Sequence, residues 1–223
     1  MPADLMAPST VTVERGAGIV VLRESARKAV RSGGLWGYIF GIVVASSALS
    51  YGRIYKTQSE RDQLAAAFGT NKAAAALFGP AVRLATVAGF TVFKSIMTLI
   101  VLGAIWGLLT STRLLRGEED AGRWELLLAG QTTQTRATAQ ALGGLAAGVA
   151  TLWAVTAVII VLTGQYSKVD IAAGPMLYFS LALVATPVMF LACGALTSQL
   201  AGTRRRAATY AAWALGTSYA LRM

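Results

Sequence analysis

The densest group of charged side chains in the sequence lies between residues 113 and 136, in the stretch RLLRGEEDAGRWELLLAGQTTQTR. It holds four arginines and four acids, although only 13% of the chain is charged. On a helix over residues 117–129, Glu119 and Arg123 are one turn apart with the acid first, the better order for an ion pair. An exposed pair stabilises a helix by only about 0.3–0.5 kcal/mol. The pattern, with an apolar ridge that includes Trp124, therefore predicts a short helix that docks into the groove of a soluble partner.

Lys94, in the apolar stretch TVFKSIM, is the second candidate for a functional side chain. An ionisable residue within an apolar segment marks a functional site by default, so Lys94 is a possible residue of a transport pathway. The alternative is structural, because Lys94 lies near one end of its segment and its long stem can carry the ammonium to water.

The sequence holds few residues suited to catalysis, metal binding or nucleotide binding. The sequence has no histidine and one cysteine, Cys193, which we interpret as a small packing residue. It lacks a GxxxxGK[ST] phosphate-binding loop, an HExxH motif and a CxxC motif. We therefore expect no catalytic, metal-binding or cofactor-binding residues in the chain. The absence of acids from the apolar segments also argues against a carrier coupled to protons or sodium.

The apolar residues are gathered into long blocks that predict an all-α membrane protein. The chain is 55% hydrophobic with a mean hydropathy of +0.58, and about 20 apolar residues suffice for one helical crossing. Short segments of alternating polarity, which would indicate a membrane β-barrel, do not occur. The blocks predict a transmembrane domain over 34–223, with spans at about 35–51, 84–110, 137–163, 174–200 and 207–223.

The distribution of lysine and arginine predicts the orientation of these spans. Twelve cations lie before the first span and in the second and fourth connections, against six in the other two connections. Cations are retained on the cytoplasmic side. The N-terminus and residues 113–136 are therefore expected in the cytoplasm of a multi-pass cell-membrane protein. The net charge of +10 is explained by this topology and indicates no nucleic-acid partner.

The segments that flank the first span are also predicted to be helical. Residues 1–33 form a cytoplasmic N-terminus whose second half is amphipathic, which predicts an interfacial elbow helix that contacts membrane lipids and ends at Ser32-Gly33-Gly34. The alternative is a solvated cytoplasmic helix without lipid contact. Residues 53–83 predict an outer helical loop of two short helices, closed by Gly69 and by Gly79-Pro80.

Small residues at four-residue spacing predict close helix packing in the membrane. They occur as Gly37 with Gly41, Gly103 with Gly107 and Gly144 with Gly148. The fifth apolar block has no polar segment after it, so we expect the chain to be part of a longer polypeptide with a sixth helix and a second half.

The charged stretch RGEEDAGRWELLLAG at 116–130 resembles the EE…GR.ELLLA signature of ABC exporter permeases. The chain is most similar to actinobacterial polyketide-antibiotic exporter permeases, of the multidrug and tetronasin efflux type, and matches their N-terminal half. The stretch NKAAAALFGP at 71–80 and the amphipathic segment before the first span resemble the same group.

The resemblance implies that residues 113–136 carry a coupling helix that seats in a separate ATPase subunit, present in two copies. That subunit would bind ATP and Mg²⁺, and the pump would export amphipathic drugs or polyketide antibiotics. The alternative is a membrane scaffold or sensor that recruits another soluble partner through the same loop. The residues that the resemblance assigns to the ATPase contact are Glu118, Glu119, Gly122, Arg123, Glu125 and Leu126.

Overall fold

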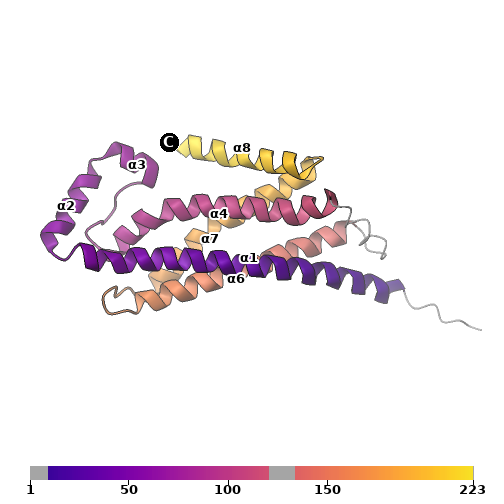
Figure 1. Cartoon of the computed structure of the whole chain (residues 1–223), viewed down its shortest axis with the longest axis horizontal. Coiled ribbons are helices and arrows are strands. Elements are labelled where there is room, and N and C mark those ends of the chain that lie inside the picture. The colour runs from indigo at the N-terminus through magenta and orange to yellow at the C-terminus, as the bar shows by residue number, and fades with distance from the viewer. Residues whose placement is uncertain (1–9, 121–133, 223) are drawn as a thin grey trace, which may run out of the picture.

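The structure is a computed structural model that describes residues 10–120 and 134–222 of the chain, and the described part is helical apart from short connections. Long helices run side by side, and two short helices lie at one end of them (Figure 1). The helices are α1 (Thr10–Ile54), α2 (Gln58–Gly69), α3 (Lys72–Phe78), α4 (Val87–Asp120), α6 (Gln134–Gly164), α7 (Ala173–Leu200) and α8 (Arg204–Arg222).

Four of these helices are long and apolar enough to cross a membrane. The candidate spans are Ser25–Ile54, Val87–Leu115, Thr138–Gly164 and Ala173–Leu200, and they correspond to the first four predicted spans. The fifth predicted span is helical as α8, but it is not among these four. Its first turn is Arg204-Arg205-Arg206, and charge at that density lowers the apolar length that is available to lipid. Five spans therefore remain a prediction.

The expected break between an elbow helix and the first span is wrong. The structure has one unbroken α-helix from Thr10 to Ile54, which passes through Ser32-Gly33-Gly34. Glycine favours a break in water because it gains conformational freedom there. Here Gly33 is buried against α6, where a β-carbon would collide with the carbonyl oxygen of Gly148. Gly33 is thus a contact point between two helices and does not end the first one.

The long helices form two parallel pairs, α1 with α6 and α4 with α7. Along α1, Gly37 lies against Leu152 and Gly41 against Ile159, so both helices run in the same direction. Along α4, Gly107 meets the backbone of Pro187. Successive spans cross a membrane in opposite directions, so the first and third spans, and the second and fourth, must run the same way. The two pairs meet this requirement.

The predicted small-residue pairs all lie at these contacts, as the sequence analysis expected. We name the α1–α6 contact the glycine seam; its members are Gly33, Gly37 and Gly41 of α1 with Gly144 and Gly148 of α6. At Gly37 a β-carbon would lie 2.7 Å from the Leu152 oxygen, closer than a methyl group tolerates. Close approach of two backbones strengthens dispersion contacts, which associate helices in lipid.

The centre of the bundle joins all four candidate spans in one apolar cluster. Phe40, Leu99, Ile160 and Leu183 come from α1, α4, α6 and α7, and each is 0% exposed. Several hydroxyl groups in this interior donate to carbonyl groups of their own helices, among them those of Ser95 and Thr112. For example, the hydroxyl of Thr156 donates to the carbonyl of Leu152 at 2.7 Å and lies 3.2 Å from that of Gly37. The interior therefore leaves few polar groups unpaired.

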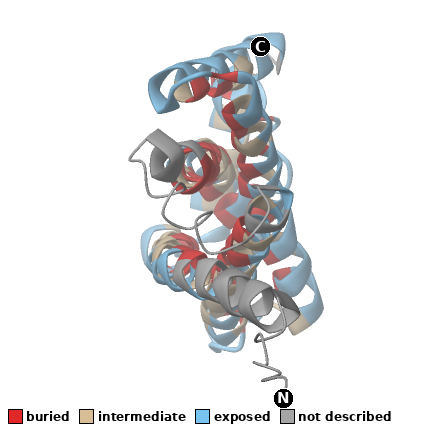
Figure 2. Ribbon diagram, turned by 90° about the vertical axis from the view of Figure 1, so that its right-hand side faces the viewer, coloured by how far each residue is buried: buried red, intermediate tan, exposed pale blue. Residues whose placement is uncertain are grey.

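The outer faces of the long helices are apolar as well. Buried residues face the contacts between helices, and exposed residues cover the outside (Figure 2). Leu162, Leu181 and Leu196 are each about 60% exposed or more, at 66%, 59% and 62%. Soluble monomers rarely expose apolar patches of this extent. The outer faces are suited to contact with lipid.

Helices α2 and α3, which we name the helical cap, occupy the end of the bundle that is remote from the start of α1 (Figure 1). They are the two short helices expected between residues 53 and 83. Thr57 begins α2 with a capping box, in which the Glu60 carboxylate accepts from the backbone N–H groups of Thr57 (2.9 Å) and Lys56 (2.8 Å). The hydrogen bond from Thr57 is the main reason that the pKa of Glu60 lies below its ordinary value.

Substitution of Gly33 by alanine tests the glycine seam. The added methyl group collides with the backbone of Gly148, so Gly33→Ala should lower the free energy of unfolding by about 1–3 kcal/mol. The measurement is thermal unfolding of the detergent-purified chain, followed by circular dichroism.

The matched control is Gly52→Ala in the same helix, where a methyl group meets nothing within 4 Å. Since alanine is the better helix former, by about 1 kcal/mol, this variant should be as stable as the natural chain or slightly more so. Equal melting of the two variants would show that the seam is not close-packed.

Candidate functional site

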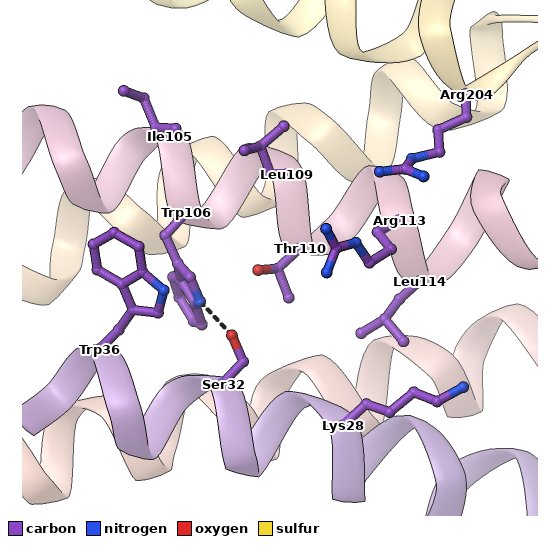
Figure 3. Close-up of a pocket in the computed structure, with 10 residues that line it drawn as sticks. All are labelled: Lys28, Ser32, Trp36, Ile105, Trp106, Leu109, Thr110, Arg113, Leu114 and Arg204. Carbon is purple, nitrogen blue, oxygen red and sulfur yellow. Dashed lines mark hydrogen bonds between the residues drawn. The ribbon is translucent and has the colours of Figure 1, made fainter.

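A cavity of about 560 Å³ lies between α1, α4 and the first turn of α8. Its lining comes from the middle of α1, from the second half of α4 and from Arg204 at the start of α8. Figure 3 shows Ser32 and Trp36 of α1 facing Trp106 of α4, whereas Ile105 and Leu109 point away from α1. The residues that line it are Lys28, Ser32, Trp36, Ile105, Trp106, Leu109, Thr110, Arg113, Leu114 and Arg204.

Two tryptophans form the aromatic end of the cavity, and we call Trp36 and Trp106 the tryptophan pair (Figure 3). Trp106 of α4 is 4% exposed, and its indole N–H donates to the hydroxyl of Ser32 on α1 at 2.8 Å. The ring of Trp36 is held edge-on to Phe40, with 6.4 Å between ring centroids. A buried indole requires such a partner for its N–H, so the hydrogen bond fixes the wall of the cavity.

Three cations form the other end, and we call Lys28, Arg113 and Arg204 the cationic rim. They come from α1, α4 and α8, and all three are exposed. No acidic residue is among the described residues that line the cavity. The lining of the cavity therefore has cationic side chains toward one end and aromatic surface at the other.

Helical periodicity explains this polarity. Lys28, Ser32 and Trp36 follow one another at four-residue intervals, which places them on one face of α1. At a rise of 1.5 Å per residue, Lys28 and Trp36 are separated by about 12 Å along the helix. Arg113 follows Trp106 by about 10 Å on α4 by the same rule. Because α4 runs antiparallel to α1, both tryptophans reach one end of the cavity and both cations the other.

Lys94 lies elsewhere, beside the helical cap. It is exposed on α4, and its ammonium nitrogen is 5.3 Å from the centroid of the Phe90 ring. With Phe68, Phe78 and Phe93 it lines a second, aromatic cavity of about 290 Å³. This location fits the structural alternative, in which the stem carries the charge toward the end of the bundle, and a pathway role for Lys94 remains a prediction.

The predicted coupling residues are only partly within the described chain. Helix α4 continues to Asp120, ten residues past the predicted end of the second span, and so includes the backbone of Glu118 and Glu119. The remaining members of the set, Gly122, Arg123, Glu125 and Leu126, lie outside the described residues. The predicted contact with an ATPase is untested by the structure.

Sequence reasoning missed the cavity, because its lining comes from three separate segments. One signal was available in the first of them, the four-residue spacing of Lys28, Ser32 and Trp36. The second was the pairing of Trp106 with Arg113 two turns later. Neither indicates a cavity until the antiparallel packing of α1 and α4 is known.

The fold and the cavity define a polytopic helical protein with lipid-compatible outer faces and an amphipathic interior space. A family model described as "Multidrug efflux system permease Rv1217c, C-terminal domain" matches residues 28–223. The chain therefore belongs to this family of multidrug efflux permeases and is a membrane protein. No curated protein and no solved structure matches the chain.

The match confirms the coarser part of the resemblance that the sequence suggested, a permease of the multidrug efflux type. The tetronasin-type group and an actinobacterial origin stay predictions. The matched model describes a C-terminal domain, whereas the resemblance placed the chain as an N-terminal half, so that placement has no support from the match.

Removal of the Ser32 hydroxyl tests the wall of the cavity. Ser32→Ala leaves the buried indole N–H of Trp106 without its partner, which should lower the free energy of unfolding by about 1 kcal/mol or more. Water that replaces the hydroxyl should also make the indole more solvated, which is seen as a red-shifted tryptophan emission. The control is Ser46→Ala in the same helix, whose exposed hydroxyl donates to the Val43 carbonyl one turn earlier in α1. If both variants match the natural chain in stability and emission, the hydrogen bond does not hold the wall.

Proposed function

We propose that the chain is the membrane subunit of an ATP-driven ABC efflux pump, energised by a separate ATPase. The observation that carries the proposal is the match to the multidrug efflux permease family over residues 28–223. The alternating direction of α1, α4, α6 and α7 supports it, because this packing is what a polytopic permease requires. The substrates are amphipathic drugs or polyketide antibiotics exported across the cell membrane.

In this proposal the ATPase, in two copies with bound ATP and Mg²⁺, docks on the loop between α4 and α6. The cytoplasmic side is then the side of the N-terminus and of residues 113–136, in agreement with the excess of arginine there. Four of the six proposed contact residues are charged, and stability alone does not explain so much charge in one loop. The proposed contact residues are Glu118, Glu119, Gly122, Arg123, Glu125 and Leu126.

Removal of the proposed ion pair tests whether this loop couples the ATPase to transport. Glu119→Ala combined with Arg123→Ala should weaken co-purification of the ATPase at least about tenfold, since charge-assisted contacts contribute about 1.5–3 kcal/mol each. Drug efflux from cells should fall to background, while membrane insertion stays normal. The measurements are ATPase pull-down, efflux of a fluorescent drug, and the amount of chain in the membrane fraction.

The matched control removes one acid and one cation from the helical cap, Asp62→Ala with Lys72→Ala, both of which are exposed. This variant should bind the ATPase and export as the natural chain does. Full efflux in the Glu119–Arg123 variant would overturn the coupling assignment. Co-purification of a soluble partner that lacks a phosphate-binding loop would favour a membrane scaffold or sensor.

A further inference from the structure

We propose that the aromatic cavity between the helical cap and α4 binds compact aromatic acids. The ring system of the ligand lies among the aromatic side chains of the cavity, and its carboxylate lies at the ammonium group of Lys94. The proposed function assigns no ligand to this cavity, so the inference goes beyond it. It depends on the rings and on the charge of the cavity, and not on transport.

The cavity has the composition of a small-molecule site. Its volume is about 290 Å³, and its lining comes from the end of α1, from the helical cap and from the first turns of α4. Aliphatic side chains complete a lining in which five aromatic rings predominate, those of Tyr55, Phe68, Phe78, Phe90 and Phe93. Small-molecule sites are typically apolar and aromatic, with a few placed polar groups that orient the ligand.

The rings of the cavity are held in place by one another. Phe93 of α4 contacts Phe68 of α2 and Phe78 of α3, with 5.5 Å and 5.7 Å between ring centroids. On the side of α1, Tyr55 lies edge-on to Phe90 at 5.7 Å. Inclined rings at these distances are the favoured geometry of aromatic pairs. The rings are therefore oriented before a ligand enters, which lowers the ordering cost of binding.

The helical cap is tied to α1, so the walls of the cavity belong to one unit. The side chain of Arg61 in α2 donates through Nε to the carbonyl of Tyr55 at 3.2 Å. The hydroxyl of Tyr51 donates to the carbonyl of Leu84, in the connection before α4, at 3.2 Å. These two hydrogen bonds fix both connections of the cap against the end of α1.

Lys94 supplies the charge of the cavity. It follows Phe90 by one helical turn, which places both residues on one face of α4, and its ammonium nitrogen lies 5.3 Å from the centroid of the Phe90 ring. That ring is the one partner that the described residues give to Lys94. An ammonium group without an anionic partner attracts a carboxylate, and apolar walls beside it strengthen the attraction relative to bulk water.

The acids of α2 do not take this position. The carboxylate of Glu60 accepts from backbone N–H groups at the start of α2, and that of Asp62 accepts from the amide of Gln58 at 2.9 Å. Both acids are thus engaged within their own helix, and neither is among the residues that line the cavity. The anionic position beside Lys94 is left to a ligand.

The volume of the cavity limits the ligand to a compact molecule. One turn of a helix, about 10 Å wide and 5.4 Å long, is larger than the cavity of about 290 Å³, so a helix of a partner protein does not fit. An acyl chain of a lipid is the competing occupant, but it gains nothing from the charge of Lys94. The fitting ligand is a small ring system with one anionic group at its edge.

The test compares three probes that share one ring body. They are 6-fluoro-2-naphthoate, its neutral carboxamide and the corresponding cationic naphthylmethylammonium. The full chain is placed in phosphatidylcholine nanodiscs, and saturable binding is measured by fluorine NMR, with empty nanodiscs subtracted. The naphthoate should bind about fivefold more tightly than the carboxamide, as expected for one partly exposed ion pair, and the ammonium probe should bind most weakly.

Two results in the natural chain would overturn the proposal. Equal affinity for the naphthoate and the carboxamide would show that Lys94 selects no anion. Absence of saturable binding would show that lipid chains fill the cavity.

Removal of the charge locates the binding. Lys94→Met keeps an apolar stem near Phe90 without the ammonium, so the affinity for the naphthoate should fall about fivefold, to that for the carboxamide. Binding of the carboxamide should stay unchanged, which shows an intact cavity. Lys94→Arg should keep the preference, and so should the control Lys72→Met, an exposed cation of the helical cap outside the lining. A preference that persists in Lys94→Met, or that is lost in Lys72→Met, would contradict the assignment.

A larger side chain at Leu64 tests the aromatic part of the site. Leu64 lines the cavity, so Leu64→Trp should abolish binding of the naphthoate and of the carboxamide alike. The control is Leu77→Trp, at a position that is 47% exposed and outside the lining. Thermal unfolding shows whether each variant is folded, and the Lys94 variants decide the question where Leu64→Trp is not. Full binding in a folded Leu64→Trp chain would place the probes elsewhere and overturn the proposal.

The binding assay needs neither the ATPase nor transport, so it fails independently of the proposed function. In the Glu119–Arg123 variant, probe binding should be unchanged even when efflux is lost. Normal probe selectivity in a chain that never co-purifies with an ATPase would overturn the proposed function alone. An active ATP-driven pump without probe selectivity would overturn the inference alone.

Discussion

The close approach of α1 and α6 at the glycine seam is the constraint on which the rest of the bundle depends. In lipid there is no hydrophobic gain from the association of apolar helices, so contact area must come from backbones that touch. Gly33 and Gly148 provide that contact, since a side chain on Gly33 would strike the opposite carbonyl. The same requirement explains why α1 remains helical through Ser32-Gly33-Gly34: the end of the helix at that point would remove its tightest contact and expose backbone groups to an apolar surrounding.

The second parallel pair is built in the same way, and the cavity follows from the difference between the pairs and the contact that joins them. Glycines of α4 receive Pro187 of α7 at close range. Helices α1 and α4, in contrast, meet through large rings and side chains, among them Trp106 and Phe40. Large side chains hold two helices apart, and between the tryptophan pair and Arg113 the lining of α4 includes Thr110, a smaller side chain. The amphipathic cavity thus follows from close packing at the α1–α6 and α4–α7 contacts and looser packing at the α1–α4 contact.

Much of the architecture was readable from the sequence because the membrane imposes simple rules. Apolar block length predicted five spans, and four of them have the length and composition of spans in the structure. The spacing of Gly37 with Gly41 and of Gly103 with Gly107 predicted contact points. The continuity of α1 through Ser32-Gly33-Gly34 could not be predicted. These residues favour a break in a chain surrounded by water, and the contact that keeps the helix intact comes from α6. The candidate cavity was equally hidden, since Lys28 and Arg113 are far apart in sequence and only antiparallel packing places both in the lining of one cavity. Lys94 attracted attention as the one charge within an apolar run, yet its neighbour is an aromatic ring beside the helical cap.

Helix α4 connects the cavity to the loop that the proposed function assigns to the ATPase. It runs unbroken from Val87 to Asp120, so Trp106, Arg113 and Glu118 belong to one continuous helix. Arg113 and Glu118 are five residues apart, about 7.5 Å along the axis. A helix without a proline or a bulge moves as a unit over such a distance. Under the proposed function, displacement of the end of α4 by the ATPase would therefore move Arg113 and Trp106 together, and would do so relative to Lys28 and Trp36 on α1. The glycine seam holds α1 to α6 more tightly than the large rings hold α1 to α4. Movement under the proposed function would therefore occur at the α1–α4 contact, which lines the cavity.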